Sequence, residues 1–471
     1  MTPSLSNIRD EIASFFLPDD APAAPLWLLN GRADGYKWLS QPHQDWLRAL
    51  NWKPAAGACI ALPDATGIGG AVVGLGEDAH RHATPLIAGA LSHYLPEGNY
   101  HFAEQPETPE LAALAWAMGA YAFHEYHSAE KRGPRRLRLP NNVSLDAVLD
   151  AAQAVWLGRD LINTPANDCG PAELESAVRA LAREFGAQVE SVVGDDLLVG
   201  GFRLHHAVGR ASDRAPRLID LKWGQEGARR VTVIGKGVTF DTGGLDIKPA
   251  SNMLLMKKDM GGAASAIALA AMIMAAKLPL RLRLLIPAAD NNISANAFRP
   301  GDVIRSRNGA TVEIGNTDAE GRLLLADAID LANEDEPDTI VTLATLTGAA
   351  RAALGPDLPP FYTDDEAFAA ALAEASMRVG DPLWRMPFWP NYDVYLKSEI
   401  ADMNNVGGGG FAGSIVAAMF LKRFVKKARR FAHFDIYGWM PRALPGKPAG
   451  GEPQAARALF DVLAHETGMG R

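Results

Sequence analysis

The feature that most constrains the fold is the alternation of apolar segments with helical segments after residue 215. The helical segments are expected at 261–276, 323–334, 364–379, 410–427 and 453–466. The apolar segments that alternate with them are "RLIDLKW", "RVTVIGKGV", "RLRLLIPAAD", "DTIVTLATLTG" and "RFAHFDIYGW". Strands covered on both faces read as nearly continuous apolar runs, so the pattern predicts an α/β fold with a mixed, largely parallel sheet and helices on both faces. In such sheets ligands bind beyond the carboxyl ends of the strands.

A smaller α/β domain is expected before this sheet, because 471 residues exceed what one compact core accommodates. The segment "EKRGPRRLRLPNN" at 130–142 is basic and carries two prolines, which is typical of a domain boundary. The helical segment "SLDAVLDAAQAVWLGRDLI" follows it and must end before Pro165. We therefore expect an N-terminal α/β domain at 1–140, a linker helix at 141–165 and a C-terminal domain at 166–471.

Composition argues against several classes of protein. The net charge of −9 disfavours a broad nucleic-acid footprint and binding to an anionic membrane surface. Cys59 and Cys169 are far apart and lack CxxC spacing, so we expect no cysteine zinc site, no disulfide framework and a reducing cytoplasm. The N-terminal segment lacks the apolar core of a secretion signal. The longest uncharged stretch, 261–276, is shorter than the ~20 residues of a membrane span and is predicted to be a buried core helix.

Three motif matches are weak. The segment "GLGEDA" (74–79) resembles a dinucleotide-binding turn, but its acidic pair would face the pyrophosphate, so a loop is expected. The segment "GKG" (235–237) lacks the first glycine and the Ser/Thr of a phosphate-binding loop. The segment "HEYH" (124–127) is one residue short of a zinc-binding HExxH and indicates an exposed helix face. Since no other histidines have metal-ligand spacing, a bound metal would need oxygen-rich ligands.

The segment "NTDAEGR" (316–322) places two carboxylates and a guanidinium at alternate positions just before the apolar run "LLLADAIDLA". One explanation is local, because Thr317 and Glu320 fit the capping-box pattern at a helix start. That explanation leaves Asp318 and Arg322 unaccounted for. In an extended chain Asp318 and Glu320 would point the same way, and converging carboxylates need a cation between them. That cation is either Arg322 or a metal ion.

Two upstream segments add the same kinds of side chain. "KGVTFDTGGLDIKP" (236–249) supplies Lys236, Asp241 and Lys248 around a Gly-Gly turn, and "MLLMKKDMGGAA" (253–264) supplies Asp259. Taken singly, Asp241 fits a turn, Asp259 a helix N-cap and Lys248 a solvated charge. Together with NTDAEGR, they bring four carboxylates to loops and helix starts that follow strands. Such hard ligands favour divalent cations, and four carboxylates suit two metal ions about 3.5–4 Å apart.

These three motifs, in this order and at this spacing, resemble the signature of the cytosolic leucyl aminopeptidases, peptidase family M17. The segments "LINTPAND" (161–168), "AFRPGDV" (297–303) and "IADMNNVGG" (400–408) also resemble the family. The resemblance is strong from residue 155 to the end and weak before 150, where the family carries a variable α/β domain. It implies that 166–471 is a catalytic dimetal peptidase domain.

The resemblance also implies a role for each matching residue. One divalent ion would be held by Asp241, Asp318 and Glu320, and the second by Lys236, Asp241, Asp259 and Glu320. Lys236 would have to be neutral, and the metal ion would depress its pKa. A hydroxide bridging the two ions would attack the scissile carbonyl, and the ions would also bind the free α-amine of the substrate. Lys248 would stabilise the oxyanion, and Arg322 would hold a bicarbonate that moves the proton.

A pocket for the first substrate side chain is implied as well. Its lining positions would be Met256, Thr345, Leu346, Gly348, Tyr437 and Met440. Relatives usually have a small residue where this chain has Tyr437, and a tyrosine brings more volume and a polar tip. If its ring points into the pocket, long or aromatic substrate side chains should be hindered. Alternatively, Tyr437 turns away to pack against Trp439 or a neighbouring helix.

The function implied by the resemblance is a cytoplasmic, metal-dependent aminopeptidase that releases leucine and similar residues from peptides with a free N-terminus. Two divalent ions per subunit are expected, Mn²⁺ or Zn²⁺, although Mg²⁺ or Co²⁺ also fits oxygen ligands. The family implies a homohexamer, while no membrane is expected as a partner and the acidic balance gives no support to nucleic acid. The alternatives are a two-metal hydrolase of another class, such as a phosphoesterase, and a non-catalytic peptide-binding or DNA-binding protein.

Overall fold

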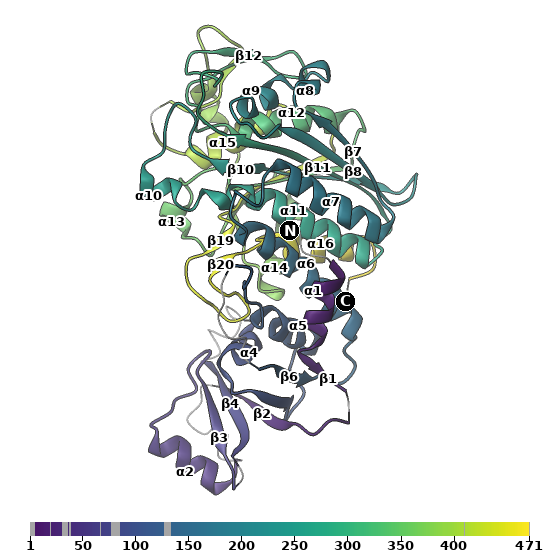
Figure 1. The fold of residues 1–471 in the computed structure, drawn as a ribbon, viewed down its shortest axis with the longest axis vertical. Coiled ribbons are helices and arrows are strands. Elements are labelled where there is room, and N and C mark those ends of the chain that lie inside the picture. The colour runs from purple at the N-terminus through teal and green to yellow at the C-terminus, as the bar shows by residue number, and fades with distance from the viewer. Residues whose placement is uncertain are drawn as a thin grey trace.

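The computed structural model describes residues 5–470 apart from 19, 31–35, 37–38, 66, 77–84, 127–132 and 409. Parts of the weak motifs at 74–79 and 124–127 therefore lie outside the described residues. The molecule is elongated, and two sheet-containing units are stacked along its long axis (Figure 1). Both ends of the described chain lie near the junction between these units (Figure 1).

The smaller unit contains a six-stranded sheet with the order β1-β6-β5-β2-β4-β3. Neighbouring strands pair in parallel except β3, which runs antiparallel to β4. Its last strand, β6, comes from the predicted boundary segment, so that segment completes the sheet. The strands are β1 (Phe16–Leu17), β2 (Ala24–Asn30), β3 (Cys59–Pro63), β4 (Ile68–Gly76), β5 (Gly98–Phe102) and β6 (Arg135–Arg138). The helices are α1 (Leu5–Ala13), α2 (Gln41–Ala49), η1 (Ile87–Ala90), α4 (Leu91–Tyr94) and α5 (Pro109–Gly119).

Helix α6 (Leu145–Asn163) follows the smaller unit and is buried along most of its length. It begins after Ser144, whose hydroxyl accepts a hydrogen bond at 3.3 Å from a backbone amide in the first turn, and it ends before Pro165 as expected. It packs against α1 and α5 and also against α11 (Gly261–Ala275) of the larger unit. The predicted linker helix is thus part of a shared core, while the boundaries at 140 and 165 stay predictions.

A buried arginine on α6 fastens the two units to each other. Arg159 is fully buried and donates a hydrogen bond to Met118 O, at the end of α5, at 2.6 Å. Its guanidinium also pairs with Glu452 at 2.8 Å and donates to Gly446 O at 2.7 Å. Because a buried charge needs such partners, these contacts fix the orientation of α6 against both units.

The larger unit is built on a nine-stranded sheet with the order β16-β15-β18-β14-β9-β11-β8-β7, in which β10 also pairs with β11. The central strands β18, β14, β9 and β11 are parallel, whereas β15 and β8 run antiparallel to them. The predicted mixed, largely parallel sheet is therefore confirmed. Its strands are β7 (Gln188–Val193), β8 (Arg217–Trp223), β9 (Arg229–Gly235), β10 (Gly237–Asp241), β11 (Leu280–Asn291), β14 (Thr339–Ala344), β15 (Pro360–Tyr362), β16 (Trp384–Arg385) and β18 (Arg430–Asp435).

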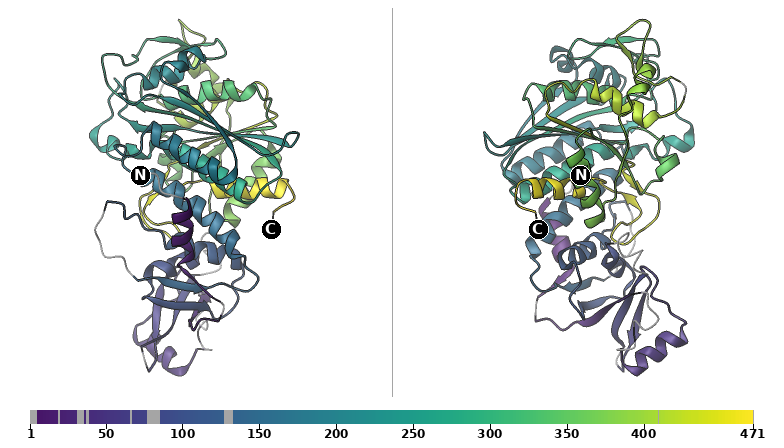
Figure 2. Two further views of the ribbon diagram at one scale, coloured as in Figure 1. Left: turned by 45° about the vertical axis from the view of Figure 1, so that its right-hand side comes forward. Right: turned by 180° about the vertical axis from the view of Figure 1, so that it is seen from behind.

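Helices cover both faces of this sheet. Side chains alternate along its central strands, so each face carries apolar side chains that the helices bury. Along β11, Leu284 and Ile286 enter one core, and Leu285 and Ala289 enter the other. Figure 2 shows the sheet between its two helical layers. The first core contains residues of α6, α7 (Pro171–Phe185), α11, α14 (Glu366–Arg378) and α16 (Ala456–Glu466). The second core contains residues of α8 (Asp196–Val199), α9 (Arg203–Gly209), α12 (Gly321–Asn333) and α15 (Gly413–Lys422).

The stretch 256–275 is long and apolar enough to cross a membrane, yet 94% of its most apolar window is buried inside the protein. It comprises the short helix η2 (Met256–Met260) and α11, and α11 packs between the sheet and α6. The expectation of a buried core helix at 261–276 is therefore confirmed.

Several elements were not among the predicted ones. Strand β7 has only exposed or half-buried residues, and β15 and β16 are only three and two residues long, so none gives a long apolar run. A three-stranded sheet, β12-β13-β17, places residues 403–404 beside the strand that precedes NTDAEGR. The remaining elements are β12 (Val303–Arg305), β13 (Thr311–Glu313), β17 (Met403–Asn404), β19 (Trp439–Met440), β20 (Gly450–Gly451), α10 (Ala250–Met253), α13 (Arg351–Leu354) and η3 (Pro390–Leu396).

Candidate metal centre

The predicted metal ligands come from four chain segments that meet at the carboxyl ends of the central strands. Lys236 follows β9, and Asp241 is the last residue of β10. Asp259 lies in η2, directly ahead of α11, while Asp318 and Glu320 precede α12. This is the edge at which parallel α/β sheets bind ligands.

Glycines allow these segments to approach closely. A Cβ on Gly262 would lie 2.2 Å from Leu343 O, so only glycine lets α11 begin against β14. A Cβ on Gly321 would lie 2.6 Å from the Lys236 Cε atom and 2.8 Å from its Nζ atom. The glycine of NTDAEGR therefore leaves the space through which Lys236 reaches Glu320.

Three buried carboxylates converge at this edge. One oxygen each of Asp241, Asp259 and Glu320 lies within 4.8 Å of the other two. The three residues are only 2%, 3% and 1% exposed. Like charges this close, removed from water, repel strongly unless cations or protons neutralise them.

Lys236 neutralises one side of this cluster. Its Nζ atom lies 2.7 Å from Asp259 Oδ2 and 2.8 Å from Glu320 Oε1. Burial lowers the pKa of Lys236, but the charges of Asp259 and Glu320 outweigh burial and raise this pKa above its ordinary value. Arg322, which the sequence offered as the cation between Asp318 and Glu320, forms no ion pair with either carboxylate among the described residues.

Lys248 neutralises the other side. Its Nζ atom lies 2.8 Å from Asp241 Oδ2 and also contacts Asp318 Oδ1. Burial lowers the pKa of Lys248, but the charges of Asp241 and Glu320 raise it to a net value above the ordinary one. Burial and the charge of Asp241 raise the pKa of Asp318 to about 6, although Lys248 opposes this shift.

The electrostatics of Glu320 indicate that the centre is short of positive charge. Burial and the charge of Asp241 raise the pKa of Glu320 to about 8 despite the nearby Lys236. Asp259 Oδ2, Asp318 Oδ1 and Glu320 Oε1 are buried, and their only partners among the described residues are the lysine ammonium groups. Buried anionic oxygens with open lone pairs are what divalent cations bind, so these residues fit a metal centre.

The local conformation of NTDAEGR differs from the one expected. Residues 317–318 form a turn rather than an extended chain, and α12 begins at Gly321 with Glu320 as its N-cap. The Thr317 hydroxyl donates to Gly243 O at 2.6 Å and accepts from Asp246 N at 2.9 Å. The predicted capping box of Thr317 and Glu320 is therefore wrong, because the threonine joins this turn to the Gly-Gly turn instead.

Arg322 lies beside the centre on the first turn of α12. It is 6% exposed and donates a hydrogen bond to Asn405 O at 2.5 Å. Its Nε atom is buried and has no hydrogen-bond partner in the described part of the chain. Burial lowers the pKa of the Arg322 guanidinium to about 10, although the charges of Glu320 and Asp435 raise it. Arg322 therefore has donor capacity left for an anion or a water molecule.

Two asparagines that support the centre were not predicted. Asn291 Nδ2 donates to Asp241 Oδ1 at 2.8 Å and to Thr317 O at 3.1 Å, which joins two of the motifs. Asn405 accepts from Gly315 N at 2.7 Å and donates to Asn316 O at 2.8 Å, which braces NTDAEGR. Two features of the sequence could have identified them as site residues. Asn291 lies at the end of an apolar strand, and Asn405 lies in the segment "IADMNNVGG".

The predicted pocket residues lie in three segments around the same edge. Thr345 is the most central, because its hydroxyl donates to Asp259 Oδ1 at 2.8 Å and its carbonyl accepts from Lys236 Nζ at 3.2 Å. Leu346 N donates to Asp435 at 3.1 Å, and Gly348 is exposed. Met256 starts η2, the helix of Asp259, while Tyr437 and Met440 follow β18.

Tyr437 contacts two cations that the sequence did not predict as its neighbours. Lys258 Nζ lies 4.8 Å and Arg351 Cζ 4.4 Å from the centroid of its ring. Burial lowers the pKa of Lys258 to about 8, an effect that Asp259 opposes. Neither Lys258 nor Arg351 was predicted as a site residue.

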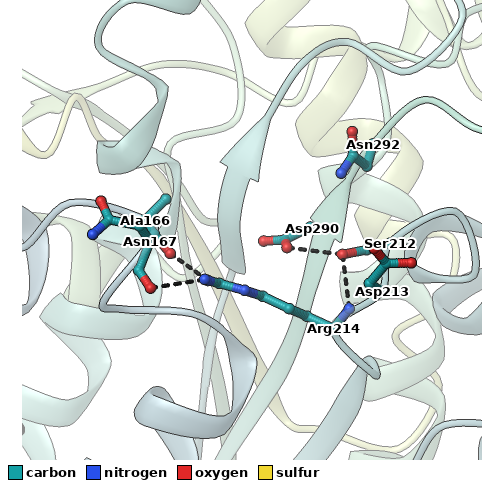
Figure 3. A pocket seen from close by; sticks show the side chains of 7 residues that line it. All are labelled: Ala166, Asn167, Ser212, Asp213, Arg214, Asp290 and Asn292. Carbon is teal, nitrogen blue, oxygen red and sulfur yellow. Dashed lines mark hydrogen bonds between the residues drawn. The ribbon is translucent and has the colours of Figure 1, made fainter.

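A separate cavity of about 300 Å³ opens on the other side of the end of β11 (Figure 3). Asp290 and Asn292 line it, whereas Asn291 between them points its amide toward the acidic centre. Ser212 and Arg214 line the opposite wall, and Ser212 donates to Asp290 at 3.0 Å. None of the predicted site residues lines this cavity, so it is distinct from the centre.

Family models match both units of the chain. The catalytic domain of the cytosol aminopeptidase family matches residues 156–460, and the N-terminal domain of the M17 aminopeptidases matches residues 27–140. All five predicted metal ligands, Lys248 and Arg322 lie inside the first match.

Individual proteins agree with the family models. The crystal structure of a cytosol aminopeptidase from Coxiella burnetii is 43% identical, has a TM-score of 0.89 and covers 97% of this chain and 100% of that one. The bottromycin maturation enzyme BotP in complex with Mn is 30% identical, with a TM-score of 0.85 and coverage of 95% and 100%. A probable cytosol aminopeptidase of Mycobacterium ulcerans (strain Agy99) is 40% identical over 368 residues, which are 74% of this chain and 70% of that protein. The chain therefore belongs to the cytosol aminopeptidase family, and it is a metal-dependent aminopeptidase of peptidase family M17.

Proposed function

We propose that residues 166–471 form a two-metal peptidase domain that releases leucine and similar residues from the free N-terminus of peptides. The observation that carries this proposal is the convergence of Asp241, Asp259 and Glu320, one oxygen of each lying within 4.8 Å of the other two. Asp259 Oδ2 and Glu320 Oε1 are buried and have only the Lys236 ammonium group as a partner among the described residues. One ion would be held by Asp241, Asp318 and Glu320, and the other by Lys236, Asp241, Asp259 and Glu320. The metal in each site, Mn²⁺, Zn²⁺, Mg²⁺ or Co²⁺, is left open by these ligands.

When bound, two divalent cations would polarise the scissile carbonyl as Lewis acids and activate a water molecule as the nucleophile. The residues of the chain then have distinct tasks. Lys236 must lose its proton to offer a lone pair, and the open space beside Gly321 lets its amine reach the cluster. Lys248, whose side chain is 13% exposed at the mouth of the site, can donate to the oxyanion that forms on the substrate.

Arg322 is proposed to hold a bicarbonate that moves the proton. Its buried Nε atom has no acceptor within the described residues, and this unused donor supports an anionic partner. A neutral water molecule would satisfy the same donor less strongly, so removal of bicarbonate should slow the reaction without abolishing it.

The first substrate side chain is proposed to lie against the residues that adjoin the centre. Thr345 bonds directly to Asp259, and Tyr437 and Gly348 lie on the same side. These contacts support the pocket formed by Met256, Thr345, Leu346, Gly348, Tyr437 and Met440. Binding of the free α-amine near the acidic cluster would restrict cleavage to the N-terminal residue.

Hydrolysis of Leu-p-nitroanilide tests this function most directly. Activity should disappear after chelation and return when Mn²⁺ or Zn²⁺ is added back. Acetyl-Leu-p-nitroanilide is the matched control and should not be cleaved, because its amine is blocked. Activity that survives chelation, or measurable cleavage of the acetylated substrate, would point to another class of hydrolase.

A homohexamer in the cytoplasm is proposed on the family resemblance. The name cytosol aminopeptidase, carried by relatives, supports this location. Sedimentation equilibrium of the purified protein measures the assembly, and a mass of six subunits is the expected result. A monomer at micromolar concentration would contradict the proposal.

A further inference from the structure

Two positively charged side chains contact the ring of Tyr437 next to the acidic centre. Lys258 Nζ lies 4.8 Å and Arg351 Cζ 4.4 Å from the ring centroid. Lys258 is only 2% exposed, whereas Arg351 is half-buried on the first turn of α13. Cations favour the face of an aromatic ring, so Tyr437 compensates both charges in part.

Neither cation has an acidic partner. The Lys258 ammonium group forms no hydrogen bond or ion pair with any residue that the structure describes, apart from the ring contact. Arg351 donates one hydrogen bond, to Thr347 O at 3.2 Å. A cation removed from water without a counterion is costly, and a ring replaces only part of the lost hydration.

The carboxylates in the surroundings each form a hydrogen bond or ion pair with another described residue. Asp259 accepts from Thr345 and faces Lys236, and Asp435 accepts from the backbone and hydroxyl groups around residues 346, 347 and 414. Asp357 pairs with Arg442 at 2.9 Å. The positive charge of Lys258 and Arg351 is therefore open to a group that comes from outside the described chain.

These cations adjoin residues of the proposed pocket. Lys258 immediately precedes Asp259 in η2. A Cβ on Gly348 would lie 3.1 Å from Arg351 Nη2, so the guanidinium adjoins a proposed lining position. A Cβ on Gly438, the residue after Tyr437, would lie 3.1 Å from the Thr345 methyl group. The Thr345 hydroxyl in turn donates to Asp259. Thr345 therefore connects the residues around Tyr437 to the acidic centre.

We propose that Lys258 and Arg351 make this enzyme favour peptides whose first residue is acidic, with the substrate carboxylate as the missing counterion of both cations. The proposal rests on the proposed function, because it takes the first side chain to lie in this pocket. In this proposal Tyr437 limits the depth of the pocket. The carboxylate of a Glu side chain would accept charge-assisted hydrogen bonds from both cations. A Lys or Arg side chain would meet two like charges and be rejected.

The test compares Glu-p-nitroanilide with Gln-p-nitroanilide at pH 7 on the metal-loaded enzyme. These substrates have nearly the same shape and differ in charge, so their ratio of kcat/KM isolates the electrostatic term. Because hydrogen bonds to a charged group are stronger than those to a neutral one, kcat/KM should be at least about tenfold higher for the Glu substrate than for the Gln substrate. A ratio of one or below would overturn the proposal, and so would a preference for Ala over both, which would mean that the cations only hold Tyr437 in place.

Variants identify the residues responsible. Lys258→Met and Arg351→Gln should each bring the Glu-to-Gln ratio close to one, whatever happens to the absolute rates. Lys222→Met removes the same charge from a half-buried position on β8 and should leave the ratio unchanged. Because Lys258 is buried and its variant can fail to fold, the half-buried Arg351 keeps the test decisive. A ratio unaffected by Arg351→Gln would overturn the role of the pair.

Leu-p-nitroanilide separates this inference from the proposed function. Hydrolysis of the Leu substrate with no preference for Glu over Gln would overturn the acidic selectivity alone. Failure to hydrolyse every substrate after loading with Mn²⁺ or Zn²⁺ would overturn the proposed function and the inference together.

Discussion

Helix α12 has buried carboxylates at its start and in its middle, and their surroundings are opposite. In the middle, Asp327 accepts hydrogen bonds from three backbone amides at 2.9, 3.1 and 2.9 Å. Asp330, one turn further on, accepts two hydrogen bonds from Asn308 at 3.1 and 2.8 Å. At the start, Glu320 Oε1 accepts no hydrogen bond from the described residues and faces Lys236 at 2.8 Å.

Burial alone does not distinguish these groups. It raises the pKa of Asp327 to about 7, of Asp330 to about 6 and of Glu320 to about 8. The difference lies in the partners, because backbone amides already use the lone pairs of Asp327, whereas those of Glu320 remain open. Buried carboxylates whose oxygens are engaged hold loops in place, and those whose oxygens are open can bind a cation.

The largest effect is expected when the carboxylate at the start of α12 is removed. Glu320→Ala should lower kcat for Leu-p-nitroanilide by several orders of magnitude, because it removes an oxygen ligand shared by both proposed ions, and Asp259→Ala should do the same. Asp330→Ala removes a carboxylate from the same helix and should leave kcat per folded molecule near wild type. Circular dichroism would verify that each variant is folded. Near-wild-type turnover of Glu320→Ala would contradict the two-metal assignment.

The next effect concerns the lysine that faces the substrate. Lys248→Ala should lower kcat by ~10²–10³-fold with a much smaller change in KM, since a contact with the oxyanion acts mainly in the transition state. Arg322→Ala should be milder, because buffer bicarbonate or water can take over its task. Steady-state kinetics at saturating metal would measure both. Changes confined to KM in both variants would be inconsistent with these roles.

A measurement of the free energy of unfolding tests the hydrogen-bonded carboxylate, Asp327. Asp327→Asn keeps the shape but replaces an acceptor oxygen by a donor that faces backbone amides. Each amide left without an acceptor costs about 1–3 kcal/mol in the free energy of unfolding. Denaturant unfolding of the metal-free protein would measure this loss, and kcat per folded molecule should be unchanged. A variant as stable as the wild type would show that these hydrogen bonds do not hold the loops.

The same residue predicts a pH dependence. Burial raises the pKa of Asp327 from its ordinary value of 3.8 to about 7, so between these values the unfolded chain has lost a proton that the folded chain still holds. Rising pH then favours the unfolded state, and the contribution of Asp327 to stability falls until pH 7. The stability difference between wild type and Asp327→Asn should therefore shrink as the pH rises from 4 to 7. A difference independent of pH would contradict the shift.

The smallest effect concerns the proposed pocket, where two cations contact the ring of Tyr437. Tyr437→Ala should raise kcat/KM for Phe and Trp substrates relative to Ala, because removal of the ring enlarges the pocket. The ratio is measured for p-nitroanilides in wild type and variant. Agreement of the two ratios within about threefold would mean that Tyr437 does not limit the size of the first side chain.

The sequence by itself determined the central strands and most long helices of the larger unit, and the places of the charged side chains along them. Nearly continuous apolar runs predicted the central strands β8, β9, β11, β14 and β18, because strands covered on both faces leave little room for polar residues. Lys236, Asp241, Asp259 and Glu320 directly follow strands or precede helices, so their meeting at one edge followed from the rule for parallel sheets. The two-domain α/β architecture was predictable for the same reason.

Only the tertiary structure decided which side chains face each other. The sequence suggested a capping box for Thr317, but its hydroxyl bonds to a glycine carbonyl 74 residues earlier. Asn291 and Asn405 brace the centre through contacts with other motifs, and Lys258 and Arg351 meet on Tyr437 from separate segments. Local patterns encode whether a residue is helical, extended or buried. Partners far apart in sequence are set by strand order and helix packing, which bring together loops that no local pattern relates.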